Sequence, residues 1–224
     1  MTHAVQGSVR LRQVAKAYRD AAGVRTVLDG VDLDLAPGEF AAVSGPSGSG
    51  KSTLLNIVAA IESADAGSVV VGGVELAGVP EPASTLFRRR HVGVVFQFFN
   101  LIDTLTVREN LALPLALAGH RDDGRVDALL ETLGLSDRAD SFPDVLSGGE
   151  QQRVGVARAM VHGPAVILAD EPTGNLDEAA GEAVLDLLAG AVAEGVTVLM
   201  VTHSAVAAAR AARRLELHHG RLSE

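Results

Sequence analysis

The chain has 224 residues, of which 47% are hydrophobic, and it carries a formal net charge of −9. This length and apolar content predict a folded chain with a sizeable core and argue against intrinsic disorder. The acidic balance argues against a nucleic acid as the main ligand, because basic groups that meet phosphates dominate such affinity. There are no cysteines, so disulfides and thiolate metal sites are excluded.

The first third of the chain is predicted to form strands and one helix. Residues 8–17 and 27–35 partly alternate apolar and polar side chains, which predicts two half-exposed strands. The short apolar run at 40–43 predicts a buried strand, and a helical apolar pattern follows at 54–61 after a loop of glycine and serine. After a turn, residues 67–74 predict another strand.

The rest of the chain alternates between strands and helices around a long helical stretch. This stretch runs from about 101 to 160, with breaks near Gly119, Gly134 and Pro143. The remaining predicted elements are strands at 92–96, 166–169, 196–201 and 214–217 and helices at 178–192 and 205–212. The order favours an α/β core with a parallel sheet, antiparallel strands at the amino-terminal end and a helical subdomain. We expect one domain spanning 1–224, with the helical subdomain inserted at about 98–160.

No apolar stretch reaches the roughly 18 to 20 residues that a membrane span needs. The longest candidate, residues 111–118, is short and contains Pro114. Residues 1–4 do not form a charged segment followed by an apolar run, so no signal peptide is expected. Any membrane role is therefore expected to run through a partner.

A glycine-rich loop after the strand at 40–43 fits the pattern G-x-x-x-x-G-K-[ST] without a mismatch. Its residues are Gly45, Pro46, Ser47, Gly48, Ser49, Gly50, Lys51 and Ser52. The glycines let backbone N–H groups point at phosphate oxygens, and the helix that begins near Lys51 directs its dipole at the same anion. We expect Lys51 to reach the β- and γ-phosphates and Ser52 to offer its hydroxyl to Mg²⁺. The alternative is a flexible loop of glycine and serine.

The strand at 166–169 leads into two carboxylates, Asp170 and Glu171. Ligands of open α/β sheets bind at the carboxyl ends of parallel strands. We therefore expect Asp170 to hold Mg²⁺, which would also relieve the repulsion between the two acids, and Glu171 to orient or deprotonate an attacking water. The alternative is an ordinary acidic turn before Pro172. The phosphate loop upstream favours the catalytic interpretation.

Two polar residues follow other buried strands. His203 comes after the strand at 196–201, where it could contact a γ-phosphate, and Gln97 ends the strand at 92–96, where its amide oxygen could join the Mg²⁺ shell. Each type is more often an ordinary surface residue. The other six histidines keep that interpretation.

Residues 146–153, with the sequence LSGGEQQR, contain a second helix start suited to an anion. Ser147 and Glu150 form the capping-box pattern S-x-x-E, and Gly148 and Gly149 leave backbone N–H groups uncovered. The alternative is a plain capped helix. If both helix starts bind one nucleotide, they must meet either within the chain or between two copies.

The chain resembles the ATP-binding cassette (ABC) ATPases along nearly its whole length. Its motifs follow the family order: Walker A at 45–52, the Q-loop at Gln97, the signature at 146–153, Walker B at 166–171, the D-loop at 175–177 and the switch histidine at His203. Tyr18 falls at the position of the aromatic that stacks on adenine, although it could instead pack on the core. Gly174-Asn175 stands where Ser-Ala is commoner, and Ser204 where Asp is frequent.

The resemblance implies a P-loop NTPase fold of the RecA-like type, with an antiparallel β subdomain and a helical signature subdomain, and it implies ATP and Mg²⁺ as ligands. It implies Glu171 and His203 as catalytic residues and Ser52, Gln97 and Asp170 as metal ligands. The implied ATP-binding residues are Tyr18, Gly45, Pro46, Ser47, Gly48, Ser49, Gly50, Lys51, Ser52, Thr53, Gln97, Ser147, Gly148, Gly149 and Glu150.

The resemblance also implies partners. The family forms ATP-dependent, head-to-tail pairs of cassettes, in which Ser147, Gly148 and Gly149 would act on the partner's nucleotide. Residues 88–101 and 171–177 are similar to the macrolide-export and lipoprotein-release cassettes, although Asp103 stands where that branch often has Pro. Such cassettes pair with an integral membrane permease that has a large extracytoplasmic domain, and cell-division relatives act as levers. A peripheral position on the cytoplasmic face of the membrane follows.

The sequence admits alternative interpretations of two segments and of the function. The arginines at 88–90 form either a solvated face or a contact to a permease or lipid. Phe98, Phe99, Leu101 and Ile102 either line the groove for a permease's coupling helix or belong to the subdomain core. An importer cassette, for example for amino acids, and a soluble ABC scaffold of the iron–sulfur-assembly type are alternatives. A non-catalytic module is disfavoured because Glu171 is intact, and nucleic-acid partners are disfavoured by the charge.

Overall fold

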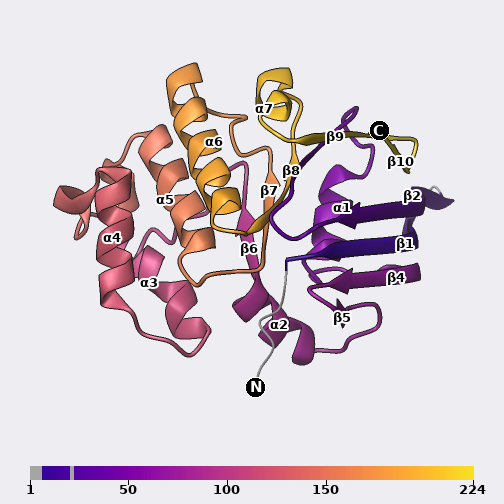
Figure 1. The fold of residues 1–224 in the computed structure, drawn as a ribbon, viewed down its shortest axis with the longest axis horizontal. Coiled ribbons are helices and arrows are strands. Elements are labelled where there is room, and N and C mark those ends of the chain that lie inside the picture. The colour runs from indigo at the N-terminus through magenta and orange to yellow at the C-terminus, as the bar shows by residue number, and fades with distance from the viewer. Residues whose placement is uncertain (1–6, 21–22) are drawn as a thin grey trace.

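The computed structural model describes residues 7–20 and 23–224, which form two β-sheets with helices packed against them (Figure 1). The four residues at 1–4, on which the expectation of no signal peptide rests, lie outside this described part. Among the described helices, none combines the length and the apolar character that a bilayer span requires.

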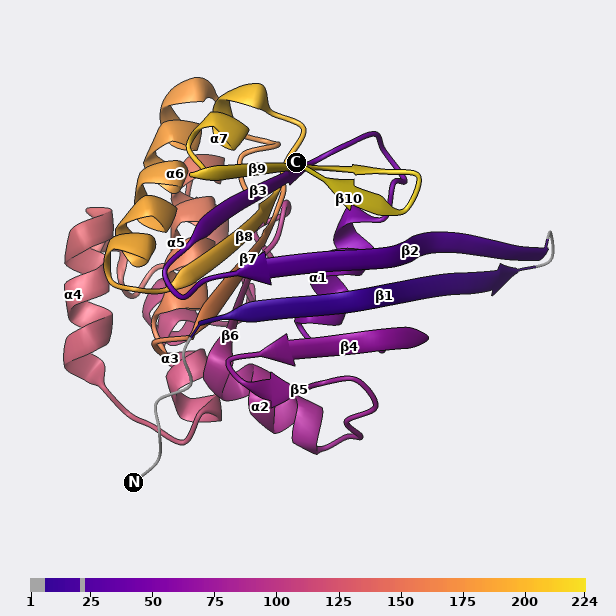
Figure 2. The same ribbon diagram turned by 45° about the vertical axis from the view of Figure 1, so that its right-hand side comes forward.

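The first sheet is antiparallel, with the strand order β2-β1-β4-β5. Its strands are β1 (Val9–Asp20), β2 (Gly23–Leu35), β4 (Ala66–Val71) and β5 (Val74–Glu75). The inner half of β2 alternates exposed and buried residues, as expected for a sheet with one wet face. Its outer half is exposed, and Figure 2 shows that β1 and β2 project together beyond the neighbouring strand β4.

The second sheet has six strands in the order β10-β9-β3-β8-β7-β6. The strands are β3 (Phe40–Ser44), β6 (Val92–Val95), β7 (Val166–Asp170), β8 (Thr197–Val201), β9 (Arg213–His218) and β10 (Arg221–Ser223). All neighbours are parallel except β9 and β10. The central strands are nearly continuous apolar runs, because both faces of this sheet are covered.

Helix α1 (Lys51–Val58) contacts strands of both sheets, and one hydrophobic core joins the antiparallel sheet, α1 and one face of the parallel sheet. The opposite face of the parallel sheet packs against α5 (Gly148–Met160) and α6 (Glu178–Ala193) in a second core. A third core lies among α3 (Val107–Leu117), α4 (Asp123–Leu133) and the other face of α5. Helix α5 therefore belongs to two cores at once.

Short 3₁₀ turns at Ser136–Arg138 and Pro143–Val145 lead from α4 to α5. Pro114 lies inside α3, and both ends of that helix are nevertheless regular, with a capping box at Thr106 and Glu109. The predicted strand at 67–74 is divided by a turn at 72–73 into β4 and β5.

Some elements differ from the expectations. Helix α2 (Ala83–His91) was not predicted, because only Ser84 and Phe87 are buried and no apolar period marks the segment. Helix α7 (Ala205–Ala209) ends earlier than the predicted 212, and strand β9 begins at Arg213. The final hairpin to β10 was also missed, because its three residues carry no periodic signal.

Candidate nucleotide site

The glycine-rich loop lies between the carboxyl end of β3 and the amino end of α1. Gly50 caps α1 with φ of 106°, which is the left-handed region that glycine tolerates. A Cβ built on Gly50 would lie 2.8 Å from both the side chain and the carbonyl oxygen of Val27. Only glycine therefore fits, and the loop backbone is held against strand β2.

The only lysine of the loop is buried against it. Lys51 is 7% exposed, and its Nζ donates to the carbonyl oxygens of Gly45 at 2.8 Å and Pro46 at 3.0 Å. Neutral carbonyls are weaker partners for an ammonium than a phosphate oxygen is, because a bond with two charged partners is stronger. The cation is thus positioned inside the loop, where an anion can take over its bonds.

The two predicted catalytic residues lie side by side at the carboxyl ends of β7 and β8. Glu171 follows β7 with φ of 48°, a strained conformation for a residue that has a side chain. The backbone N–H of His203 donates to Glu171 Oε2 at 3.1 Å. The ring Nε2 of His203 lies 3.0 Å from Glu171 Oε1, a contact whose geometry is not that of a hydrogen bond, so Oε1 is buried without a donor among the described residues.

A cleft of about 490 Å³ gathers most of the predicted site. Its lining residues are Tyr18, Arg25, Val27, Ser47, Gly48, Gly50, Lys51, Ser52, Thr53, Gln97, Asp170, Glu171 and His203. Tyr18 Oη lies 3.4 Å from Thr53 Oγ1, so the aromatic side chain from β1 reaches the first turn of α1. The antiparallel sheet thus forms one wall of the cleft and the parallel sheet forms the floor.

The cleft also suits a divalent cation. Three oxygen-bearing side chains, Ser52, Gln97 and Asp170, line it together. Within the described residues, no three His, Cys, Asp or Glu side chains form a metal site of their own. Mg²⁺ is commonly held by one or two carboxylates together with substrate phosphates, and this donor set fits that description.

The signature segment does not line this cleft. Ser147 caps α5 in a complete capping box: its Oγ accepts from the N–H of Glu150 at 3.3 Å, and Glu150 Oε2 accepts from the Ser147 N–H at 2.8 Å and from its hydroxyl at 2.6 Å. These bonds hold the pKa of Glu150 below its ordinary value. Ser147 and Gly148 are exposed, so the second helix start, which the sequence predicts to suit an anion, faces outward.

Helix α5 also binds the loops that flank the cleft, through residues that the sequence did not single out. Gln152 is 1% exposed, and its Nε2 donates to the carbonyl oxygens of Phe96 at 3.0 Å and Pro172 at 2.8 Å. Arg158 donates to the carbonyls of Phe99 at 3.3 Å and Asn100 at 2.6 Å. The signature helix is therefore tied to the segment after β6 and to the loop after β7. No sequence pattern marks such long-range contacts.

The loops themselves also touch. Asn175 Nδ2 donates to the Gln97 carbonyl at 3.2 Å, which joins the D-loop to the Q-loop. Gln97 lines the nucleotide cleft, whereas Phe98 beside it is 68% exposed. Leu101 packs against the third core, so the apolar cluster after Gln97 is divided between core and surface.

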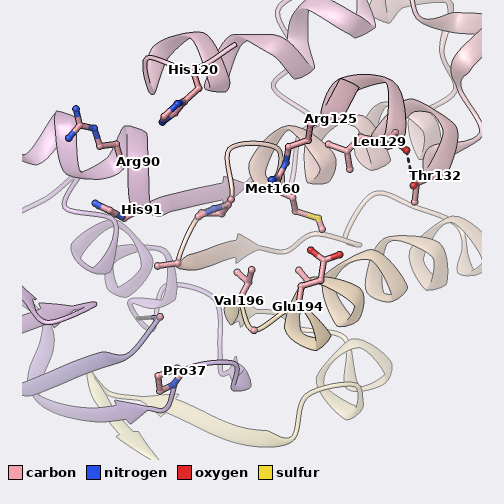
Figure 3. A pocket seen from close by; sticks show the side chains of 17 residues that line it. Pro37, Arg90, His91, His120, Arg125, Leu129, Thr132, Met160, Glu194 and Val196 are labelled. Carbon is pink, nitrogen blue, oxygen red and sulfur yellow. Dashed lines mark hydrogen bonds between the residues drawn. The ribbon is translucent and has the colours of Figure 1, made fainter. Parts of the chain in front are cut away.

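A larger cavity, of about 1000 Å³, lies away from all these residues (Figure 3). It is lined by Pro37, His91, Ala165 and Val196, each of which precedes a strand of the parallel sheet, so it lies at the amino ends of those strands. Figure 3 shows Arg90 and His91 on one side of it and Leu129 and Thr132 on the other. Ligands of such sheets bind at the carboxyl ends, where the phosphate loop is, so the smaller cleft is the candidate site.

Fold and cleft together define a P-loop nucleotide-binding domain. Residues 28–174 match the family model described as ABC transporter. An uncharacterized ABC transporter ATP-binding protein of Mycobacterium tuberculosis is 48% identical over 97% of this chain and 89% of that protein. The lipoprotein-releasing system ATP-binding protein LolD of Granulibacter bethesdensis is 43% identical, and the cell division ATP-binding protein FtsE of Escherichia coli 45% identical, each over 96% of both chains.

A solved dimeric structure of the ATP-binding cassette MJ0796, bound to ADP and Pi in a post-hydrolysis state, superposes with a TM-score of 0.89 at 37% identity. The alignment covers 96% of this chain and 97% of that one. The chain belongs to the ABC transporter family, as an ATP-binding subunit with ATPase activity. The predicted α/β P-loop fold with an antiparallel β subdomain is confirmed.

Proposed function

We propose that the chain works as a head-to-tail homodimer that drives a separate membrane permease at the cytoplasmic face of the membrane. One observation carries the dimer: the exposed helix start at Ser147 lies outside the cleft that gathers Lys51, Asp170 and Glu171. Both helix starts suit phosphate, and only a second copy can bring them to one nucleotide without a large rearrangement of the cores that α5 joins. The MJ0796 cassette, whose solved structure is dimeric, supports a dimer.

In this proposal the phosphate loop and Lys51 hold the triphosphate, and Tyr18 stacks on the adenine. Ser52, Gln97 and Asp170 would hold Mg²⁺, which would neutralise charge on the β- and γ-phosphates. Ser147 and the N–H groups of Gly148 and Gly149 from the second copy would bind the γ-phosphate from the other side.

Glu171 is the proposed general base. Its Oε1, which lacks a hydrogen-bond donor among the described residues, is available to accept a proton from water as that water attacks the γ-phosphorus. The bond to the β-phosphate oxygen breaks, and ADP and phosphate leave. His203 lies 3.0 Å from the same carboxylate oxygen, and we propose that it holds the carboxylate and the γ-phosphate in line.

Replacement of Glu171 by Gln tests this proposal. We expect E171Q to lose roughly 10²- to 10⁴-fold in kcat, the usual contribution of a general base, and to accumulate as an ATP-bound dimer. Light scattering with and without ATP measures the mass. The double variant E171Q/S147A should stay monomeric, because Ser147 acts across the interface. An ATP-bound E171Q monomer, or a dimer that tolerates S147A, would contradict the assignment.

The permease is proposed from a groove between α2, β6 and α3. A cavity of about 250 Å³ there is lined mostly by apolar residues, including Val94, Phe96, Leu113 and Leu117, and also by Arg89, Arg158 and His162. Phe98 and Ile102 nearby are 68% and 39% exposed. An amphipathic helix with an apolar face suits such a groove. Of the arginines beside it, Arg88 is bonded to Thr85 and Glu81, whereas Arg89 and Arg90 are exposed.

The names of the relatives favour a permease of the lipoprotein-release, macrolide-export or cell-division type, and with it a large extracytoplasmic domain; a macrolide export ATP-binding/permease protein, MacB, is among them. These relatives do not favour the importer alternative.

The chain contains no cysteine, so a single introduced thiol is unique. We expect F98C, and not the exposed control V24C, to crosslink to a polytopic membrane protein in native membranes. Crosslinks of equal yield from both positions would contradict the groove assignment. If neither position crosslinks to a membrane protein, a soluble scaffold would be favoured.

A further inference from the structure

Arg25 lies on the wall of the nucleotide cleft, twenty residues before the phosphate loop and outside every motif of the sequence. It sits on β2 directly opposite Tyr18 of β1, its antiparallel partner. Side chains of directly opposed residues project from the same face of an antiparallel pair. Figure 2 shows the two-stranded ribbon of β1 and β2 running beside α1, the helix that begins at the end of the phosphate loop.

The two side chains reach different parts of the segment that runs from the phosphate loop into the first turn of α1. Tyr18 Oη approaches Thr53 in the first turn of α1, at 3.4 Å from Oγ1. Arg25 Nη2 donates to the carbonyl oxygen of Gly48 in the middle of the loop, at 3.1 Å. Strands β1 and β2 therefore place an aromatic side chain at the first turn of α1 and a guanidinium at the middle of the phosphate loop.

Arg25 differs in its partner from Arg10 and Arg12, two arginines of the neighbouring strand β1. Arg10 and Arg12 both pair with Asp34 on the neighbouring strand. Within the described part of the chain, the ion pairs include none for Arg25, and its one side-chain bond goes to a neutral carbonyl. Lys51 is in the same situation, held by the carbonyls of Gly45 and Pro46. Two cations thus rest on the carbonyls of one phosphate-binding loop.

We propose that Arg25 is a nucleotide-binding residue whose guanidinium contacts the polyphosphate of the bound nucleotide, on the same wall of the cleft as the proposed adenine platform at Tyr18. A phosphate oxygen is a charged acceptor, and a guanidinium binds it more strongly than it binds a neutral carbonyl. Binding would therefore draw Arg25 from Gly48 to the nucleotide. The inference rests on the proposed ATP site and adds to it a cation from the antiparallel sheet.

The contact predicts a particular pattern of affinities. A cation on the phosphates strengthens ATP and GTP binding alike, because it does not touch the base. The platform at Tyr18 acts on the base, so its loss should change the preference between the two. We expect R25A to weaken both nucleotides about tenfold, the effect of losing one hydrogen bond between charged groups. We expect Y18A to reduce the discrimination between them.

The experiment is a titration of the full chain with fluorescent ATP and GTP analogues, together with steady-state ATPase assays. R25A should raise the dissociation constant and KM about tenfold with kcat little changed. R10A, an arginine of the same ribbon that pairs with Asp34, is the matched control and should bind as the wild type does. Circular dichroism checks that each variant is folded.

R25Q separates binding from a structural role. Glutamine keeps an N–H donor for the Gly48 carbonyl but carries no charge, so it should bind as weakly as R25A. Affinity restored in R25Q would mean that Arg25 only shapes the loop, and unchanged affinity in R25A would mean that it does not touch the nucleotide; either result overturns the inference. A wild-type chain that binds no ATP would instead refute the proposed function.

Discussion

At the scale of single residues, the signature segment shows how one side chain serves two purposes. Glu150 closes the capping box of α5 and at the same time places a carboxylate beside the exposed helix start at Ser147. Because Ser147 donates two bonds to this carboxylate, its pKa is held below the ordinary 4.5. The charge of Glu150 is therefore part of the folded state at neutral pH.

A pH dependence follows from that lowered pKa. A carboxylate with a lowered pKa stabilises the fold above its unfolded value and loses this contribution as the pH falls through the folded value. E150Q keeps the capping geometry without the charge, so it should be about 0.5 kcal/mol less stable at pH 7. The difference should shrink as the pH drops below 4.5. Urea unfolding of both proteins at pH 7, 5 and 4 measures it, and a constant difference would contradict the assignment.

Two glycines on facing helices should respond oppositely to alanine. A Cβ on Gly149 of α5 would lie 2.8 Å from the Cβ of Ala180 on α6, closer than two carbon atoms can approach. We expect G149A to cost about 1 to 3 kcal/mol and to lower ATPase activity, since α5 must shift. Nothing lies within 4 Å of a Cβ on Gly190 of α6, so G190A should stabilise by about 0.5 to 1 kcal/mol. Thermal unfolding compares them; equal effects would refute the argument.

At the scale of elements, α5 connects three parts of the molecule. Its start is the signature, and its two faces belong to separate cores. Gln152 donates to the carbonyls of Phe96 and Pro172, in the segments after the neighbouring strands β6 and β7. We therefore expect a displacement of the segment after β6, where we propose the permease groove, to be transmitted to the signature. This connection depends on the two hydrogen bonds that Gln152 donates, so a substitution at Gln152 can test it.

Gln152 is the residue on which this connection depends. Q152L removes both donated bonds, one of them buried, and takes this donor from the carbonyls of Phe96 and Pro172, which should cost about 1 to 3 kcal/mol. It should also lower kcat, because the Walker B loop loses a fixed point. The neighbouring Gln151 donates only to Leu146 within its own segment, so Q151L is the matched control. Urea unfolding and ATPase assays compare the two, and equal effects would argue against a coupling role for Gln152.

The elements also show what the sequence can and cannot predict. The strands of the parallel sheet were found because burial on both faces leaves unbroken apolar runs, as at 166–169. Helix α2 was missed because it buries only two side chains. The outer half of β2 was missed because its residues are exposed and do not alternate. Motifs located the cleft because phosphate binding requires particular backbone geometry, whereas Arg25 and Gln152 act through contacts with residues 23 and 56 positions away.

At the scale of the whole molecule, the ligand should contribute directly to stability. ATP that binds only the folded chain raises the free energy of unfolding by about 2.7 kcal/mol at a hundred times its dissociation constant. We expect the melting temperature to rise with ATP in the wild type and not in K51A, which lacks the loop cation. A thermal scan with and without nucleotide measures this. A rise of the same size in K51A would contradict the phosphate-loop assignment.

The proposed base platform at Tyr18 lies on the antiparallel sheet, whereas the phosphate loop follows β3 of the parallel sheet, and α1 packs against both sheets. A bound nucleotide would therefore contact both the antiparallel and the parallel sheet. Its affinity would depend on the spacing between the two sheets. Leu54 and Ile57 are buried in the core between α1 and the two sheets and do not line the cleft. Replacing them with smaller residues would nevertheless let the sheets move closer together. Substitutions in this core would then change the affinity for the nucleotide although they do not touch it.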